Sequence, residues 1–173
     1  MSITLTHLPV LRDEVMQYLQ VQPDGIYVDG TFGRGGYSEA ILGVKNTKVW
    51  AIDRDPEAVE AGRALSKKYS SRLHVLRGHF AEMDQLLSRE GITAVDGVVL
   101  DLGVSSPQLD DPARGFSFRE DGPLDMRMEK EGVSAADAIS ILDEQELAGI
   151  IAEYGEERYA KRVARAIVKA RKE

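Results

Sequence analysis

Several kinds of residue and segment are absent or scarce in this chain of 173 residues, and each absence excludes a class of function. No cysteine is present, which excludes disulfide bonds, thiolate metal sites, iron–sulfur clusters and a cysteine nucleophile. Only three histidines, His7, His74 and His79, are available as zinc ligands. No apolar run approaches the ~18 residues of a membrane span, and the N-terminus lacks the pattern of a signal peptide. We therefore predict a cytoplasmic protein with no membrane partner and no bound metal.

Charge is unevenly distributed along the chain. The formal net charge is −7, yet residues 1–157 carry −13, and residues 158–172 hold seven basic residues and no acidic one. Such a segment can contact phosphate groups, although a solvated helix face is the commoner explanation. With 43% hydrophobic residues, the chain can form one globular domain, or a domain with a small appendage.

Short β-branched segments alternate with helical patterns over the first hundred residues, which is typical of βαβ units. We predict strands at 26–29, 48–53, 73–76 and 95–101. The helices between and before them are expected at about 9–19, 36–43, 56–68 and 81–90. This order predicts an α/β fold with a parallel sheet, whose strands are buried on both faces.

The second part of the chain begins with a long segment that is rich in glycine and proline, residues 102–132, where we predict a functional loop. Three helices follow: one from Ser134 or Ala135, one from Asp143 to about Tyr154, and one from Glu156 to the end. In the last helix, the apolar residues that share one predicted face are Tyr159, Val163, Ala166, Ile167 and Ala170.

The strongest local motif is the glycine-rich segment from Asp29 to Gly36, DGTFGRGG, between a strand and a helix. Glycines allow the backbone to approach a ligand closely. Asp53 ends the next strand, twenty residues after Gly33, where a carboxylate can accept hydrogen bonds from a ribose diol. The two features together predict a cofactor that contains adenosine, against the alternative of a purely structural turn.

The order of the glycines distinguishes between cofactors. It departs from GxGxxG, and Asp29 would repel a pyrophosphate, whereas it could pair with the amino group of a methionine moiety. S-adenosylmethionine therefore fits better than a nicotinamide dinucleotide. Asp101, which ends the fourth strand at the same sheet edge, could face the reacting atom or only cap its loop. Phe80 is a better candidate than His79 for packing on the adenine ring.

Five segments of the chain closely resemble one family from His7 to the last residue. They are DGTFGRGGYSEAIL at 29–42, AIDRDPEAV at 51–59, LDLGVSSPQLDDPARGFSF at 100–118, DGPLDMRM at 121–128 and YGEERYAKRVARAIV at 154–168. This is the RsmH (MraW) family, which comprises 16S ribosomal RNA cytosine-N4 methyltransferases that use S-adenosylmethionine. Family members commonly have histidine in place of Tyr37 and aspartate in place of Glu129.

The resemblance implies a class I methyltransferase, with an incomplete Rossmann-like core at 1–103 and the start of a helical RNA-recognition domain at 104–173. The residues expected to contact the cofactor are Asp29, Gly33, Gly35, Gly36, Tyr37, Asp53, Phe80, Asp101 and Gln108. Among these, Asp53 would hold the ribose and Phe80 would flank the adenine. Asp101 is also the candidate for assisting methyl transfer, with a backbone carbonyl of residues 102–105 as the alternative acceptor.

The resemblance further implies that the partner is 16S ribosomal RNA in the small ribosomal subunit, and not DNA. We expect Arg114, Phe116 and Phe118 to contact the target base, and Arg158, Lys161, Arg162 and Arg165 to hold phosphates. Family members continue beyond this length, so the alternative is a non-catalytic fragment that binds cofactor or RNA without turnover. Such a fragment would lack strands of the sheet, and its oligomeric state stays open.

Overall fold

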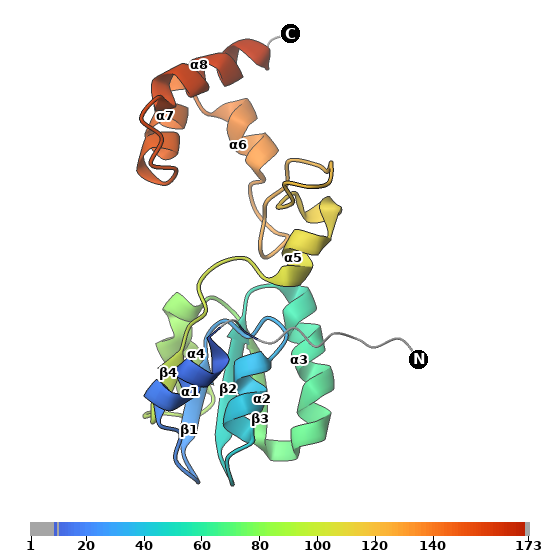
Figure 1. Cartoon of the computed structure of the whole chain (residues 1–173), viewed down its shortest axis with the longest axis vertical. Helices are drawn as coiled ribbons and strands as arrows, with labels where there is room; N and C mark the ends of the chain where they lie inside the picture. The colour runs from blue at the N-terminus through green and yellow to red at the C-terminus, as the bar shows by residue number, and fades with distance from the viewer. Residues whose placement is uncertain (1–8, 10, 172–173) are drawn as a thin grey trace. The chain divides into compact units, whose positions relative to one another are not determined.

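The computed structural model describes residue 9 and residues 11–171, which divide into two compact units (Figure 1). The first unit comprises Met1–Ser106 together with Met128–Lys130, and the second comprises Pro107–Arg127 together with Glu131–Glu173. The predicted boundary between residues 103 and 104 lies close to this division. The short segment Met128–Lys130 is the exception, because it belongs to the first unit.

A parallel sheet of four strands forms the centre of the first unit, in the order β3-β2-β1-β4. The strands are β1 (Ile26–Asp29), β2 (Lys48–Asp53), β3 (Leu73–Arg77) and β4 (Gly97–Val99). The predicted parallel α/β, Rossmann-like fold is confirmed. The fourth strand is shorter than the predicted 95–101. It pairs with β1 only from Gly97 to Val99, because the Ile26 N–H donates to the Asp96 side chain at one end and the Val99 carbonyl accepts from the Gly30 N–H of the glycine-rich loop at the other.

Helices cover both faces of this sheet (Figure 1). The helices on one face are α1 (Arg12–Leu19), α2 (Gly36–Leu42) and α3 (Pro56–Tyr69), and α4 (Met83–Arg89) packs on the other face. Alternate strand residues separate the two cores, so that Tyr27 and Val49 point to the first face, and Val28 and Trp50 point to the second. The carboxyl ends of all four strands therefore lie at one edge of a rigid layer.

The second unit contains short helices joined by an ordered loop. They are α5 (Ser106–Asp110, which begins one residue before the unit), the 3-10 turn η3 (Pro112–Arg114), α6 (Ala135–Ile141), α7 (Glu144–Glu153) and α8 (Ala160–Ala170). The segment 102–132 therefore contains helical turns that its glycine- and proline-rich composition did not predict. Ser134 and Asp143 begin α6 and α7 with capping boxes, and α8 begins four residues later than predicted.

The buried face of α8 differs from the predicted one. Ala160 and Ala164 are buried, and Ala164 packs with Leu147 and Ala148 of α7. Of the five residues that were expected to form the apolar face, only Ile167 packs into this core, whereas Tyr159 and Val163 are exposed along with two alanines. Small side chains allow α7 and α8 to approach closely, and this packing selects the alanine face.

Candidate functional site

The glycine-rich loop is attached to both neighbouring strands at the carboxyl edge of the sheet. The Gly30 N–H donates to the Val99 carbonyl (3.0 Å), and the Phe32 N–H donates to the Ile52 carbonyl (3.1 Å). Gly35 has a φ of +83°, and a Cβ at this position would lie 2.8 Å from the ring of Phe32. A residue with a side chain would therefore be strained here, so this turn requires glycine at position 35.

Asp53 lies against the glycine loop, as its position at the end of β2 predicts. Its Oδ2 accepts a hydrogen bond from the Gly33 N–H (2.8 Å), and its Oδ1 accepts one from the Asp55 N–H (2.9 Å). Each carboxylate oxygen can accept a second hydrogen bond, and the side chain is only half-buried. The carboxylate is thus oriented by two backbone groups and retains the capacity to accept hydrogen bonds from a ribose diol.

Asp29 is fully buried below the loop. Its carboxylate accepts hydrogen bonds from the Ser38 hydroxyl (2.7 Å) and the Thr31 N–H (3.3 Å). Burial raises the pKa of this carboxyl from 3.8 to about 6, although both hydrogen bonds oppose the shift. In this conformation Asp29 supports the loop from within, so its contact with a methionine amino group stays a prediction that requires the loop to open. Sequence spacing did not indicate the role of Ser38.

Asp101 is joined to the glycine loop through its backbone. The Asp101 N–H donates to the Thr31 Oγ1 (2.7 Å), while the side chain of Asp101 is exposed. Tyr37, in the first turn of α2, is buried nearby, and its pKa is raised by burial and then by the negative charges of Asp101 and Asp29. The loop that follows β1 and the residue Asp101 that follows β4 therefore meet through Thr31. Sequence reasoning missed this role of Thr31, although Thr31 lies inside the glycine motif.

Phe80 follows β3 at the same edge and begins the 3-10 turn η2 (Phe80–Glu82). A Cβ added to Gly30 would lie 3.2 Å from the Phe80 Cβ, so Phe80 is adjacent to the glycine loop. Its ring packs against that of His79 with centroids 4.5 Å apart, and the His79 Nδ1 accepts a hydrogen bond from the Ala81 N–H. His79 therefore has a structural role at the start of η2, and Phe80 remains the candidate for contact with a purine.

The charge of this edge indicates which cofactors fit. Asp53 contributes to raising the pKa of Asp29, and Asp101 and Asp29 both contribute to raising that of Tyr37. The negative charges of Asp29, Asp53 and Asp101 therefore act on one small region of the sheet edge. A pyrophosphate would be repelled there, and a cationic group would be attracted. The residues present thus fit S-adenosylmethionine, which carries a positive sulfonium, a ribose and an ammonium group, better than a dinucleotide.

The remaining predicted residues lie in the second unit. Gln108 is buried in α5, and its contact with the cofactor stays a prediction. Arg114 is also buried, and its guanidinium donates to the Arg127 carbonyl (3.1 Å), so a contact with RNA would require this side chain to become exposed. Phe116 is half-buried, whereas Phe118 is fully exposed and available to a base.

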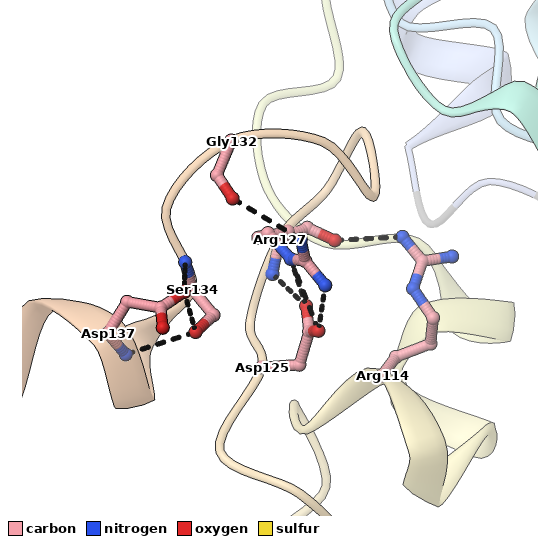
Figure 2. A network of polar contacts seen from close by, with 6 residues as sticks. All are labelled: Arg114, Asp125, Arg127, Gly132, Ser134 and Asp137. Carbon is pink, nitrogen blue, oxygen red and sulfur yellow. Dashed lines mark hydrogen bonds and ion pairs between the residues drawn. The ribbon is translucent and has the colours of Figure 1, made fainter.

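A network of polar contacts holds the loop that contains Arg114 (Figure 2). The Arg127 guanidinium forms an ion pair with Asp125 (2.6 Å) and donates a hydrogen bond to the Gly132 carbonyl (3.2 Å). The hydrogen bonds from Arg127 lower the pKa of Asp125 to about 2. The motif DGPLDMRM contains both partners, and their proximity in sequence is the signal that could have identified this pair.

The four basic residues predicted to hold phosphates, Arg158, Lys161, Arg162 and Arg165, are all exposed at or near the start of α8. Arg165 forms an ion pair with Glu144 of α7 (3.1 Å). Within residues 11–171, no ion pair involves Arg158, Lys161 or Arg162. Three of the four charges are thus available to an anionic partner.

Two other kinds of site are absent from the part of the chain that the structure describes. Within it, no three side chains of histidine, aspartate or glutamate are grouped as metal ligands would be. No helix there is both long enough and apolar enough to span a bilayer.

Comparisons with known proteins identify the family. The sequence profile of the MraW methylase family matches residues 4–173. The chain is 56% identical over 173 residues to the ribosomal RNA small subunit methyltransferase H of Granulibacter bethesdensis, covering 99% of this chain and 52% of that protein. The proteins of the same name from Rhodospirillum centenum and Rhodospirillum rubrum are 58% and 53% identical, over 96% and 100% of this chain and 51% and 53% of their own.

The chain thus spans about half the length of the curated relatives that it matches. An rRNA methylase structure from Streptococcus thermophilus aligns with 58% of each chain at 18% identity and a TM-score of 0.46, a similarity too distant to indicate function. Because the family profile covers nearly every residue and the relatives share more than half of them, this chain belongs to the MraW methylase family.

Proposed function

We propose that this chain forms the cofactor-binding part of a methyltransferase that transfers a methyl group from S-adenosylmethionine to the N4 amine of a cytidine in 16S ribosomal RNA. The observation that carries the proposal is the hydrogen bond between the Gly33 N–H and the Asp53 carboxylate, which joins the glycine loop to the ribose-binding candidate. Membership of the MraW methylase family supports the type of reaction, and the names of the relatives support ribosomal RNA as the substrate.

Different residues of the first unit would contact different parts of the cofactor. The Asp53 carboxylate would accept hydrogen bonds from the ribose, Phe80 would pack against the adenine, and the backbone at Gly35, Gly36 and Tyr37 would line the methionine part. When bound, S-adenosylmethionine supplies an electrophilic methyl group on its sulfonium. Asp29, whose carboxylate would pair with the methionine amino group once the loop opens, and Gln108 of the second unit complete the predicted set.

The nucleophile in this reaction is weak, because the lone pair of the N4 amine is delocalised into the cytosine ring. We therefore expect positioning of the amine in line with the methyl group to supply most of the rate acceleration. Asp101, whose backbone is held by Thr31 at the mouth of the loop, would accept a hydrogen bond from the N4 amine and localise its lone pair.

The target base must leave its stack to reach this edge of the sheet. Phe116 and Phe118 would contact the displaced base, and Arg114 would join them if its buried side chain becomes exposed. Arg158, Lys161, Arg162 and Arg165 would contact phosphates of the small ribosomal subunit RNA. A cytoplasmic location, where ribosomes assemble, remains part of the proposal.

Calorimetric titration with S-adenosylmethionine tests the cofactor assignment, with NADH as the control ligand. We expect saturable binding of S-adenosylmethionine, and a loss of about tenfold or more in affinity for Asp53→Ala, because the ribose loses its hydrogen-bond acceptor. Asp84→Ala is the matched control, since Asp84 is an exposed carboxylate on α4 of the same unit. We expect this variant to bind as the unmodified chain does.

The other outcomes of this titration separate the alternatives. Binding of NADH, or equal effects of Asp53→Ala and Asp84→Ala, would contradict the cofactor assignment. Binding of S-adenosylmethionine without methyl transfer to undermodified small subunits would favour the alternative of a fragment that binds cofactor without turnover.

A further inference from the structure

An aromatic ring with two guanidinium groups lies just before α8. The Arg158 Cζ lies 4.5 Å from the centroid of the Tyr159 ring, and the Arg162 Cζ lies 4.8 Å from it. These distances are those of cation–π contacts, which attract both guanidinium groups to one ring. Both guanidinium carbons are therefore held at one ring and can be at most about 9.3 Å apart.

Tyr159 does not serve the core of its own unit. That core is built from α6, α7 and α8 around Leu147, Ala148 and Ala164, and Tyr159 is not part of it. Tyr159 as a residue is 46% exposed, although it directly precedes the buried Ala160. Its side chain thus lies outside this core and contacts two neighbouring cations at the surface.

The basic residues around this ring lie at the unfavourable end of the helix, although the Glu157 carboxylate just before it accepts a hydrogen bond from the Tyr159 N–H (2.6 Å). Lys161 and Arg162 lie in the first turn of α8, where the helix dipole disfavours cations, and this turn contains no acidic residue. Among the described residues no ion pair compensates Arg158, Lys161 or Arg162, whereas Arg165 is paired with Glu144. An anionic partner would relieve this local repulsion.

We propose that Tyr159 is a positioning residue that holds Arg158 and Arg162 as a pair for neighbouring phosphates of an RNA strand. The inference rests on the proposed function, which supplies RNA as the partner, and it assigns a role to a tyrosine outside the predicted site. Two guanidinium groups that already contact one ring lose less conformational freedom when they bind than two free arginine side chains would. Removing the ring should therefore weaken binding although both charges remain.

The test is the affinity of the protein for a fluorescein-labelled single-stranded oligoribonucleotide that contains cytidine, measured by fluorescence anisotropy at several salt concentrations. We expect Tyr159→Leu to weaken binding by about tenfold and to lower the slope of log affinity against log salt by up to about 1.4, the value for two lost contacts to a single strand. Tyr159→Phe keeps the ring, and we expect its affinity to stay within about twofold of that of the unmodified protein.

Tyr154→Leu is the matched control. Tyr154 is another tyrosine of the same unit, 78% exposed at the end of α7, and among the described residues no cation lies over its ring. We expect no change in RNA affinity for this variant. Circular dichroism of each variant would verify that α7 and α8 remain folded.

Three results would overturn the inference. The first is an unchanged salt slope for Tyr159→Leu while the double variant Arg158→Ala and Arg162→Ala lowers it, because the arginines would then bind phosphate without help from the ring. The second is equal losses for Tyr159→Leu and Tyr159→Phe. The third is unchanged RNA binding for all of these variants. Titration with S-adenosylmethionine is independent of these measurements, so failure here would leave the cofactor assignment standing.

Discussion

At the scale of single residues, the carboxylates at the carboxyl edge of the sheet have different environments and therefore different roles. Asp53 is held by the backbone N–H groups of Gly33 and Asp55 and remains partly accessible. Asp29 is fully buried, and its raised pKa reflects the cost of removing a charged group from water. Asp53 thus keeps free hydrogen-bond capacity at the edge of the sheet, while Asp29 is a buried support for the loop.

The raised pKa of Asp29 predicts a specific pH dependence of stability. Its carboxyl has a pKa of about 6 in the folded chain and 3.8 as the reference for the unfolded chain, so the folded state binds the proton more tightly. Folding stability should therefore fall as the pH rises from about 4 to about 6, by up to about 3 kcal/mol. Urea unfolding followed by the fluorescence of Trp50, the only tryptophan, measures this change in the first unit.

Asp29→Asn removes the titrating group and should abolish this part of the pH dependence, so the difference between the two proteins isolates Asp29. Asp84→Asn, on the exposed side of α4, serves as the control and should retain the full dependence. Identical pH profiles for Asp29→Asn and the unmodified chain would show that Asp29 does not carry this effect.

At the scale of elements, the loop between η3 and α6 is held by close backbone approaches as well as by the Asp125–Arg127 pair. Gly115 has a φ of +74°, and a Cβ there would lie 2.4 Å from the Pro123 carbonyl oxygen and 2.8 Å from the Asp125 nitrogen. Both neighbours are backbone atoms, which cannot move aside as a flexible side chain would. The segment is therefore an ordered element, although its composition resembles that of a mobile loop.

Two glycine substitutions separate backbone strain from steric clash in this loop. Gly132 also has a positive φ, +79°, but a Cβ there would meet no atom within 4 Å. We expect Gly132→Ala to destabilise the second unit by about 1 kcal/mol from the dihedral angle alone. Gly115→Ala adds the clash and should cost at least about 2 kcal/mol more. Hydrogen exchange of the amides at 112–141 measures both effects, and equal protection in the two variants would refute the clash.

At the scale of the whole molecule, the chain has two separate sets of cores. Trp50 and the sheet belong to the first unit, and Leu147, Ala148 and Ala164 form the core of the second. No residue belongs to both sets in the described part of the chain. A ligand with most of its predicted contacts in one unit, as S-adenosylmethionine has in the first unit with Gln108 as the exception, should therefore stabilise mainly that unit.

This separation predicts a selective effect of the cofactor on thermal unfolding. At about 100 times its Kd, S-adenosylmethionine should add about 2.7 kcal/mol to the stability of the first unit and raise its Tm by about 10 °C or more. Trp50 fluorescence follows that unit, and hydrogen exchange of α7 and α8 follows the second unit during the same heating series. Equal stabilisation of both would show that the units unfold together.

Much of the first unit could be predicted from the sequence because the signals are local. A strand, a glycine-rich turn and a helix follow each other from Ile26 to Leu42, and the position of Asp53 at the end of β2 depends only on strand periodicity. Parallel strands place their carboxyl ends at one edge, so Gly33, Asp53, Phe80 and Asp101 were predicted to share that edge from their order alone. The structure places all four there.

Other features depend on contacts between distant residues, and no sequence period encodes these. Asp29 is buried because Ser38, nine residues later, satisfies its carboxylate, and Arg114 is buried because the Arg127 carbonyl accepts its hydrogen bond. In α8, two neighbouring stripes are both apolar enough to face inward, and packing against α7 selected the one with Ala160 and Ala164.

The sequence by itself determined the strand order along the chain, the glycine loop and the acidic residues beside it, because these follow from local conformation. Only the tertiary structure decided which acid is buried, which arginine is accessible and which face of α8 remains at the surface, because burial depends on what packs against each side chain.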